Sequence, residues 1–305
     1  MSNTYRAVEY REHGDSSVLE LGQREAPEPG RGQVRLAVRA AGVNPFDWKV
    51  RRGLFGPSMP AEFPAVPGSD VAGVVDAVGP EVTEFAVGDE VLGAASGSYA
   101  EITLASVANL VRKPAGMSWQ DAAALNTGVT TAYRALALLN LAKGETLLVT
   151  GASGAVGSIA AQIAVARGLR VIGTASERNH EYLRSLGVLP VLYGDGMVDR
   201  VDALGQVDAA LDTAGQGMLP ALIELTGGAE RVITIADGQA GELGVRFSAG
   251  MSDAERVPGA LAEGVELAAA GKLKLPVATY PLAEAAEAQD ESEDGHVRGK
   301  LVLLV

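Results

Sequence analysis

The sequence predicts an α/β protein in which a doubly wound parallel sheet is joined to a β-rich domain. Three observations indicate this fold class. Short alternating runs, punctuated by Gly and Pro, fill the first part of the chain to about residue 117. Apolar strand patterns then alternate with helical patterns as far as residue 244, which is typical of parallel sheets covered by helices on both faces. At Thr146–Thr150 an apolar strand pattern runs directly into a glycine-rich turn and an Ala/Ile-rich helix.

The individual elements follow from hydrophobic periodicity. In the first part we expect strands at residues 33–40, 71–78 and 90–92. In the middle part we expect strands at 146–150, 170–174, 207–212 and 231–235, and helices at 158–167 and 177–186. Beyond residue 244 the pattern predicts a helix at 282–288, a solvated turn in the acidic run 290–295 and a final strand at 301–305.

The composition of the 305-residue chain narrows its possible functions. The chain has no cysteine, which excludes disulfides, thiolate metal sites and cysteine nucleophiles. Its formal net charge of −13 disfavours binding to nucleic acid or to an anionic membrane. The first residues lack the apolar core of a signal peptide, and no later stretch is apolar enough to span a bilayer. We therefore expect a cytoplasmic protein without nucleic-acid or membrane partners.

The glycine-rich turn at residues 151–157, GASGAVG, is the strongest functional signal. A strand–turn–helix of this kind presents backbone N–H groups and the positive end of a helix to a pyrophosphate. Ala152 replaces the first glycine of the strict G-x-G-x-x-G pattern, and a tight turn without a ligand is the plain alternative. The strand before the turn and the helix after it favour dinucleotide binding. The turn residues that we expect at the cofactor are Ser153, Gly154, Ala155 and Val156.

The end of the second strand distinguishes NADPH from NADH. An NAD-dependent enzyme usually places an acid there, about 20 residues after the glycines, to bind the ribose 2′-hydroxyl. Ala175 occupies that position here, and Ser176 and Arg178 are suited to donate to a 2′-phosphate. The alternatives are that Ser176 only caps the next helix, that Arg178 is only solvated, or that Glu177 is the ribose acid. We predict NADPH as the cofactor.

Five segments of the chain together carry a resemblance to a known family. They read AAGVNPFDWKVRR at 40–52, PGSDVAGVVDAVGPEVTEFAVGDEV at 67–91, AAALNTGVTTAY at 122–133, GASGAVGSIAAQ at 151–162 and HVRGKLVL at 296–303. In this order they resemble the medium-chain dehydrogenase/reductase superfamily, specifically its zinc-free quinone oxidoreductase branch. The resemblance implies a Rossmann domain at 118–244, inserted in a GroES-like β-rich catalytic domain made of residues 1–117 and 245–305. It also implies a homodimer, commonly formed by pairing edge strands of the Rossmann sheets.

The residues at the family's zinc positions indicate an enzyme without a metal. The zinc alcohol dehydrogenases of this superfamily have a Cys after the first Gly turn and a Gly-His-Glu later in the chain. The corresponding places here hold Asn44 and Gly68-Ser69-Asp70. Without a Lewis acid, alcohol oxidation loses its usual alkoxide stabiliser. Reduction of an already activated double bond is still feasible through positioning of the hydride donor.

Asn44, Asp47 and Lys49 are the candidate catalytic residues. By the resemblance, Asn44 lies where the zinc-binding Cys would be and faces the nicotinamide or the substrate, although Asn44-Pro45 is also an ordinary turn. Asp47 and Lys49 are each suited to polarise or protonate a carbonyl. The alternative is that each is an ordinary surface residue. No residue stands out as a general acid, which fits protonation of the product by water.

Further cofactor contacts are expected from the resemblance and from the loops after the predicted strands. Such loops line the cleft at the carboxyl ends of a parallel sheet. Helix capping, packing at strand ends or simple solvation are the alternatives for these residues. Together with Asn44 they are Thr127, Thr131, Tyr193, Thr213, Ala214, Ile235, Ala236, Phe247 and Lys300.

These features predict an NADPH-dependent enzyme that reduces a small-molecule quinone or α,β-unsaturated carbonyl by direct hydride transfer. Two alternatives stay open. The first is a pathway-specific enoyl or double-bond reductase, which a pocket for an acyl or polyketide chain would favour. The second is a low-turnover NADPH-binding structural or regulatory protein, which tight binding without turnover would indicate.

Overall fold

The computed structural model describes residues 4–60, 62–250 and 255–305, and the chain divides into two compact units. The first unit contains Met1–Thr127, Leu261–Ala270 and Leu275–Val305. The second unit contains Gly128–Ala260 and Gly271–Lys274. The second unit is therefore inserted into the sequence of the first. The domain boundaries at residues 117 and 244 stay a prediction.

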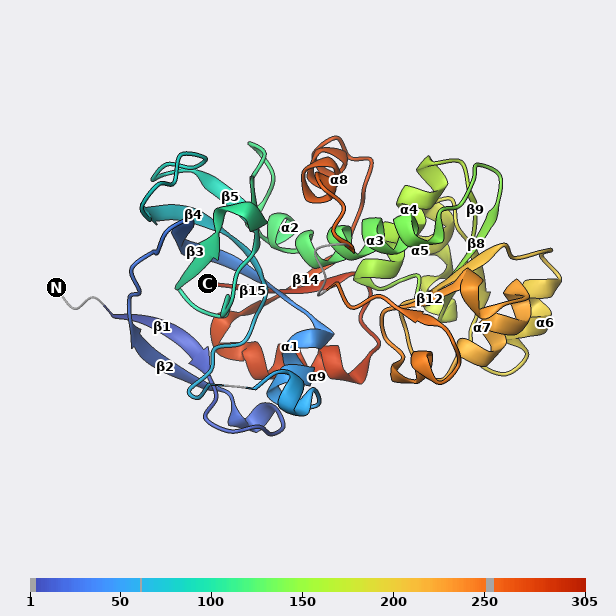
Figure 1. Ribbon diagram of the computed structural model, residues 1–305, viewed down its shortest axis with the longest axis horizontal. Helices are drawn as coiled ribbons and strands as arrows, with labels where there is room; N and C mark the ends of the chain where they lie inside the picture. Colours follow the sequence, from blue (N-terminus) through green and yellow to red (C-terminus); the bar gives the residue numbers. More distant parts are fainter. Residues whose placement is uncertain (1–3, 61, 251–254) are drawn as a thin grey trace. The chain divides into compact units, whose positions relative to one another are not determined.

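The first unit is built on a seven-stranded mixed sheet (Figure 1). The strand order is β14-β15-β3-β4-β5-β7, and β6 also pairs with β3. A separate antiparallel pair is formed by β1 and β2. The strands are β1 (Thr4–Glu9), β2 (Glu20–Glu25), β3 (Gln33–Val43), β4 (Asp70–Val78), β5 (Glu90–Ala94), β6 (Ile102–Ser106), β7 (Leu110–Arg112), β14 (Val277–Pro281) and β15 (Lys300–Leu304).

The last strand, β15, belongs to the same sheet as β3, which lies near the start of the chain. β15 pairs antiparallel with β3, so that Leu301 lies opposite Val43. Alternation along β3 buries Val34 and Leu36 on the core face of the sheet, as expected for a half-buried strand. The helices in this part of the chain are α1 (Pro45–Arg51), α2 (Trp119–Ala123), α8 (Ala260–Ala269) and α9 (Ala285–Asp294).

The acidic run at residues 290–295 is not the solvated turn that its composition predicts. Residues 285–294 form the helix α9, because this segment has buried partners despite its charge. The fully buried guanidinium of Arg51 donates to Gln289 Oε1 at 2.7 Å and forms an ion pair with Glu293 at 3.3 Å. Arg52 forms a second ion pair with Glu293 at 2.6 Å. These contacts attach α9 to α1.

The second unit contains a six-stranded sheet in which every pair of neighbouring strands is parallel. The strand order is β10-β9-β8-β11-β12-β13. The strands are β8 (Thr146–Thr150), β9 (Arg170–Ala175), β10 (Leu189–Leu192), β11 (Ala209–Asp212), β12 (Val232–Thr234) and β13 (Arg246–Phe247). The helices are α3 (Asn126–Leu139), which begins in the first unit, α4 (Ala155–Ala166), α5 (His180–Ser185), α6 (Met197–Asp202) and α7 (Leu219–Thr226).

Helices cover both faces of this parallel sheet (Figure 1). On one face, Met197 of α6 and Leu222 of α7 pack in one apolar cluster with Leu148 of β8. On the other face, Leu183 of α5 approaches Gly173 of β9, and α4 packs on β8 and β9. The predicted doubly wound arrangement is therefore present. Among the described residues, we find no helix with both the length and the apolar character needed to cross a bilayer.

The strand order reverses beside β8, whose neighbours are β9 on one side and β11 on the other. In open parallel sheets a ligand binds at such a switch point, outside the carboxyl ends of the strands. The glycine-rich turn leaves β8 at this point. The fold of the second unit therefore puts residues 151–157 where a nucleotide-binding loop is expected.

Close packing of α4 against this turn depends on Gly157. A Cβ added at Gly157 would lie 2.4 Å from the Gly151 carbonyl oxygen, which is backbone and cannot move aside easily. We expect Gly157→Ala to lower the free energy of unfolding by about 1–3 kcal/mol in urea titrations, since overpacking forces backbone shifts.

Gly238→Ala is the matched control, because the added methyl group would meet no atom within 4 Å. This control is expected to change the free energy of unfolding by less than about 0.5 kcal/mol. Equal unfolding midpoints for the two variants would contradict the assigned role of Gly157.

Candidate active site

The glycine-rich turn has the backbone conformation that a pyrophosphate site needs. Gly151 has a φ of +65°, in the left-handed region that favours glycine. Gly154 is the N-cap of α4 and gives the helix no side-chain cap. A Cβ at Gly154 would meet only the Gly151 carbonyl oxygen, at 3.4 Å, so the turn leaves open space at this position. The first N–H groups of α4 lack intrahelical acceptors and suit an anion.

A buried carboxylate, Asp212, joins three strand ends at the same edge of the sheet. The Thr150 hydroxyl donates to Asp212 Oδ1 at 2.5 Å, and the Thr234 hydroxyl donates to Oδ2 at 2.7 Å. The backbone N–H groups of Ala214 and Gly215 also donate to Oδ1, at 3.1 and 3.0 Å. Asp212 is fully buried. It therefore holds the loops after β8, β11 and β12 in fixed positions.

Most of the predicted cofactor residues lie at this carboxyl edge, because every strand of the sheet runs in the same direction. They are Ser153, Gly154, Ala155 and Val156 after β8, Ser176 and Arg178 after β9, Tyr193 after β10, Thr213 and Ala214 after β11, and Ile235 and Ala236 after β12. Phe247 ends β13 and is exposed, whereas Thr131 is buried on α3. Their contacts with a cofactor stay a prediction.

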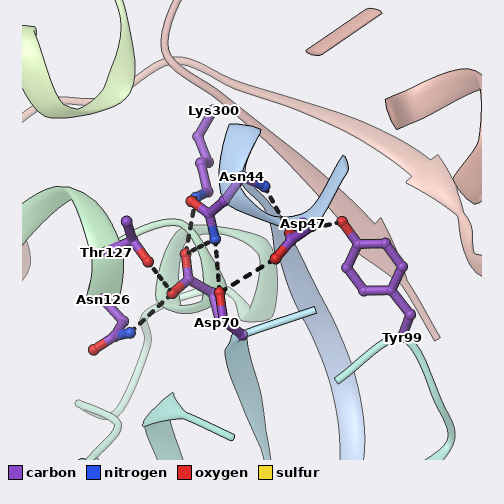
Figure 2. A network of polar contacts seen from close by, with 8 residues as sticks. Asn44, Asp47, Asp70, Tyr99, Asn126, Thr127 and Lys300 are labelled. Atoms are coloured by element: carbon purple, nitrogen blue, oxygen red, sulfur yellow. Dashed lines mark hydrogen bonds and ion pairs between the residues drawn. The ribbon is translucent and has the colours of Figure 1, made fainter. Parts of the chain in front are cut away.

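The first unit contains a second candidate site, centred on the fully buried carboxylate of Asp70 (Figure 2). The Lys300 ammonium lies 2.8 Å from Asp70 Oδ2, and its side chain is only 3% exposed. Asn126 Nδ2 and the Thr127 hydroxyl donate to Oδ1 at 2.8 and 2.6 Å. Burial alone would raise the pKa of Asp70, but the Lys300 charge and these hydrogen bonds outweigh it and lower the pKa. Asp70 and Lys300 therefore form a buried ion pair.

Asn44 is bound into this network through both ends of its amide group. It precedes α1 as its N-cap and is 3% exposed. Its Nδ2 donates to Asp70 Oδ2 at 3.0 Å and to Ser69 Oγ at 3.2 Å, and its Oδ1 accepts from Lys300 Nζ. Both amide hydrogens are thus engaged within the protein. Any contact of the Asn44 side chain with a ligand would use the carbonyl oxygen.

Asp47 is a buried acid beside the ion pair (Figure 2). Its Oδ2 accepts from the Asn44 backbone N–H at 2.9 Å and from the Tyr99 hydroxyl at 3.0 Å. Burial raises its pKa to about 7, and the nearby charge of Asp70 adds to the rise, while the Asn44 N–H, Lys300 and Tyr99 oppose it. The Lys49 ammonium lies over the Trp48 ring, 5.5 Å from its centroid.

Several residues of these two sites carry no strong sequence signal. Asp70 and Asp212 are acids at the edge of apolar strand patterns, and a buried acid in such a place needs partners. That signal points to them but does not name their partners. Asn126 and Tyr99 have no comparable signal.

No metal cluster accompanies the network. Within residues 4–60, 62–250 and 255–305, no three His, Asp or Glu side chains gather in a way that could hold a metal ion. Within the segments that the resemblance aligns with the zinc-site motifs, Asn44 and Asp70 share the ammonium of Lys300.

Comparison with known proteins shows the family to which the chain belongs. The domain described as "Alcohol dehydrogenase GroES-like domain" matches residues 30–115, and "Zinc-binding dehydrogenase" matches residues 186–303. The chloroplast envelope quinone oxidoreductase homolog of Arabidopsis thaliana is 32% identical over 97% of both chains.

Solved structures agree in fold. The quinone oxidoreductase from Coxiella burnetii has a TM-score of 0.88 and 29% identity, covering 99% of both chains. A mycobacterial structure described as complexed with NADPH has a TM-score of 0.84 and 27% identity, covering 98% of this chain and all of that one. The predicted fold class, a Rossmann sheet together with a GroES-like domain, is confirmed.

The Asp70–Lys300 pair should be essential for stability. Lys300→Met leaves the Asp70 carboxylate buried without its counter-charge, and we expect a loss of about 3–5 kcal/mol in urea unfolding. The double variant Asp70→Asn with Lys300→Met removes both charges and should lose clearly less than the single variant. A double variant as unstable as Lys300→Met, or a fully stable single variant, would show that the pair is not a buried ion pair.

Asp47 should give the protein a distinctive pH dependence. Its pKa is about 7 in the folded protein and has an ordinary value of 3.8, so the folded state holds an extra proton between these values. This contribution to the free energy of unfolding is fully present below about pH 4 and is lost as the pH rises through about 7.

The measurement is the urea midpoint of the wild type and of Asp47→Asn between about pH 5 and pH 8, where the pKa of Asp70, which is lowered, keeps that carboxylate ionised. Wild-type stability should fall relative to the variant across this range. The facing groups Tyr99, Asp70 and Lys300 are retained in the variant. Parallel profiles would remove Asp47 as the titrating group.

Proposed function

The chain belongs to the quinone oxidoreductase branch of the medium-chain dehydrogenase/reductase superfamily, and on that premise we propose that it reduces a quinone or an α,β-unsaturated carbonyl with NADPH. Its relatives named quinone oxidoreductase are similar over nearly the whole chain. NADPH, when bound, supplies the hydride. The protein's part is to bind and orient the two reactants and to keep water away from them.

The residues at the end of β9 support NADPH over NADH as the cofactor. Ala175 is the last residue of the strand, and the next residue is the half-buried Ser176. The position where an NAD-dependent enzyme places its ribose acid thus has no carboxylate. Glu177 begins a 3-10 turn and is exposed, as is the adjacent Arg178. Donors therefore dominate this edge, which suits the 2′-phosphate, and a similar mycobacterial structure is described as complexed with NADPH.

The ammonium of Lys300 supports a reaction without zinc. A divalent cation between Asn44 and Asp70 would compete with a buried positive charge that already satisfies both side chains. The site then provides no Lewis acid for an alcohol. An acceptor whose double bond is already activated by a carbonyl needs none.

Asp47 is the side chain best suited to hold a proton for the product. With a pKa of about 7 it is partly protonated at neutral pH. Ser69 Oγ lies 3.4 Å from Asp47 Oδ1 and is half-buried, so it provides a step between the buried acid and the surface of the network.

A cofactor and acceptor screen tests this function. Purified protein is mixed with NADPH or NADH and with 1,4-benzoquinone, 9,10-phenanthrenequinone or a simple enone, and nicotinamide absorbance is followed. NADPH should be oxidised with a kcat/KM at least about tenfold above that of NADH, as one charge-assisted contact contributes.

Arg178→Ala should raise the KM for NADPH while leaving NADH almost unaffected, and Arg184→Ala, an exposed arginine on α5, is the control. Equal use of both cofactors by the wild type would refute the 2′-phosphate assignment. No oxidation of either cofactor with any acceptor would refute the proposed reaction.

A further inference from the structure

Two serine hydroxyls, one after β8 and one after β9, contact the same buried amide group at the carboxyl edge of the sheet. We propose that Asn179 is a positioning residue that turns the hydroxyls of Ser153 and Ser176 into donors for the 2′-phosphate of NADPH. This inference rests on the proposed function, because it concerns the same cofactor. It adds a residue that acts through the two serines and need not touch the cofactor.

Asn179 joins two loops that leave neighbouring strands. It ends the 3-10 turn Glu177–Asn179 and is only 5% exposed. Its Nδ2 donates to Ser153 Oγ, in the glycine-rich turn after β8, and to Ser176 Oγ, directly after β9, each at 3.2 Å. Its backbone N–H donates to the Ser176 carbonyl at 2.9 Å and closes the turn. One buried amide thus holds both hydroxyl oxygens at the carboxyl edge of the sheet.

The direction of these hydrogen bonds sets the chemistry of the edge. An amide NH2 group has two hydrogens and no lone pair to offer, so both serine oxygens act as acceptors toward Asn179. Each serine still has its own hydroxyl hydrogen. Among the described residues, neither hydroxyl donates a hydrogen bond to the protein. Both half-buried serines can therefore donate outward.

A pair of donors beside an arginine selects an anion over a neutral hydroxyl group. A 2′-phosphate has three acceptor oxygens and negative charge, and it can accept from Ser153, Ser176 and the adjacent Arg178 together. A ribose 2′-hydroxyl is best bound by a carboxylate, which accepts a hydrogen bond from it. With an acceptor at position 179 the serine hydroxyls would instead turn inward. Asn179 is therefore the residue that keeps this edge a donor surface.

Asn179→Asp reverses the direction of both hydrogen bonds with almost no change in shape. The carboxylate would accept hydrogen bonds from the two serine hydroxyls and add a negative charge near the 2′ position. Asn179→Ala is the second variant, because it removes the amide without adding charge. Asn140→Asp is the control for the same chemical change, at an exposed position at the end of α3 where φ is +46° and Asp is also tolerated.

The measurement is calorimetric binding of adenosine 2′,5′-bisphosphate and of 5′-AMP, which differ only in the 2′-phosphate and require no turnover. Thermal melts confirm that each variant is folded. We expect the wild type and Asn140→Asp to bind the bisphosphate at least about tenfold more tightly than 5′-AMP. Asn179→Asp should lose most of this ratio through weaker bisphosphate binding, and Asn179→Ala should lose about threefold.

The outcomes separate this inference from the proposed function. If the wild type prefers the bisphosphate and both Asn179 variants keep the full ratio, Asn179 does not position the serines, and the NADPH preference stands. If the wild type binds the two nucleotides equally, the preference for NADPH is itself wrong. Loss of 5′-AMP affinity equal to the loss of bisphosphate affinity would mean that Asn179 only supports the fold of the loop, which also overturns the inference.

Discussion

The buried ion pair between Asp70 and Lys300 is the constraint on which the first unit depends. A carboxylate and an ammonium removed from water must satisfy each other and be hydrogen-bonded, or folding fails. Asp70 begins β4, Lys300 begins β15 and Thr127 lies in the first turn of α3, so one pair fixes the ends of three elements. The space around it is tight: a Cβ at Gly42 would lie 2.9 Å from Lys300 Cε and 2.6 Å from a backbone oxygen.

The same device recurs in the second unit with a different set of donors. In the described part of the chain Asp212 has no cationic partner, and hydroxyl and backbone N–H groups satisfy it. In both units a buried acid holds the ends of several elements in fixed positions. Burial is the main cause of the raised pKa of the neighbouring Asp47, and the charge of Asp70 adds to the rise.

The sequence predicts the sheet of the second unit well because hydrophobic periodicity is local. The expected strand Thr146–Thr150 is observed without any shift. The polar sites are harder, because their contacts are distant in sequence. Asp70 and Lys300 are 230 residues apart, and nothing in either segment indicates the other. The composition of residues 290–295 wrongly predicts a solvated turn for the same reason, because the helix there depends on Arg51, a residue of α1.

The proposed function requires direct hydride transfer from NADPH to an activated double bond without a metal. It is tested most directly by reacting a simple enone with NADPH deuterated at C4 in the presence of excess EDTA, and by locating the deuterium in the product by NMR. The expected product is a saturated ketone with deuterium at the carbon β to the carbonyl and solvent-derived hydrogen at the α-carbon. Deuterium at the carbonyl carbon of an alcohol product, or a reaction abolished by the chelator, would contradict it.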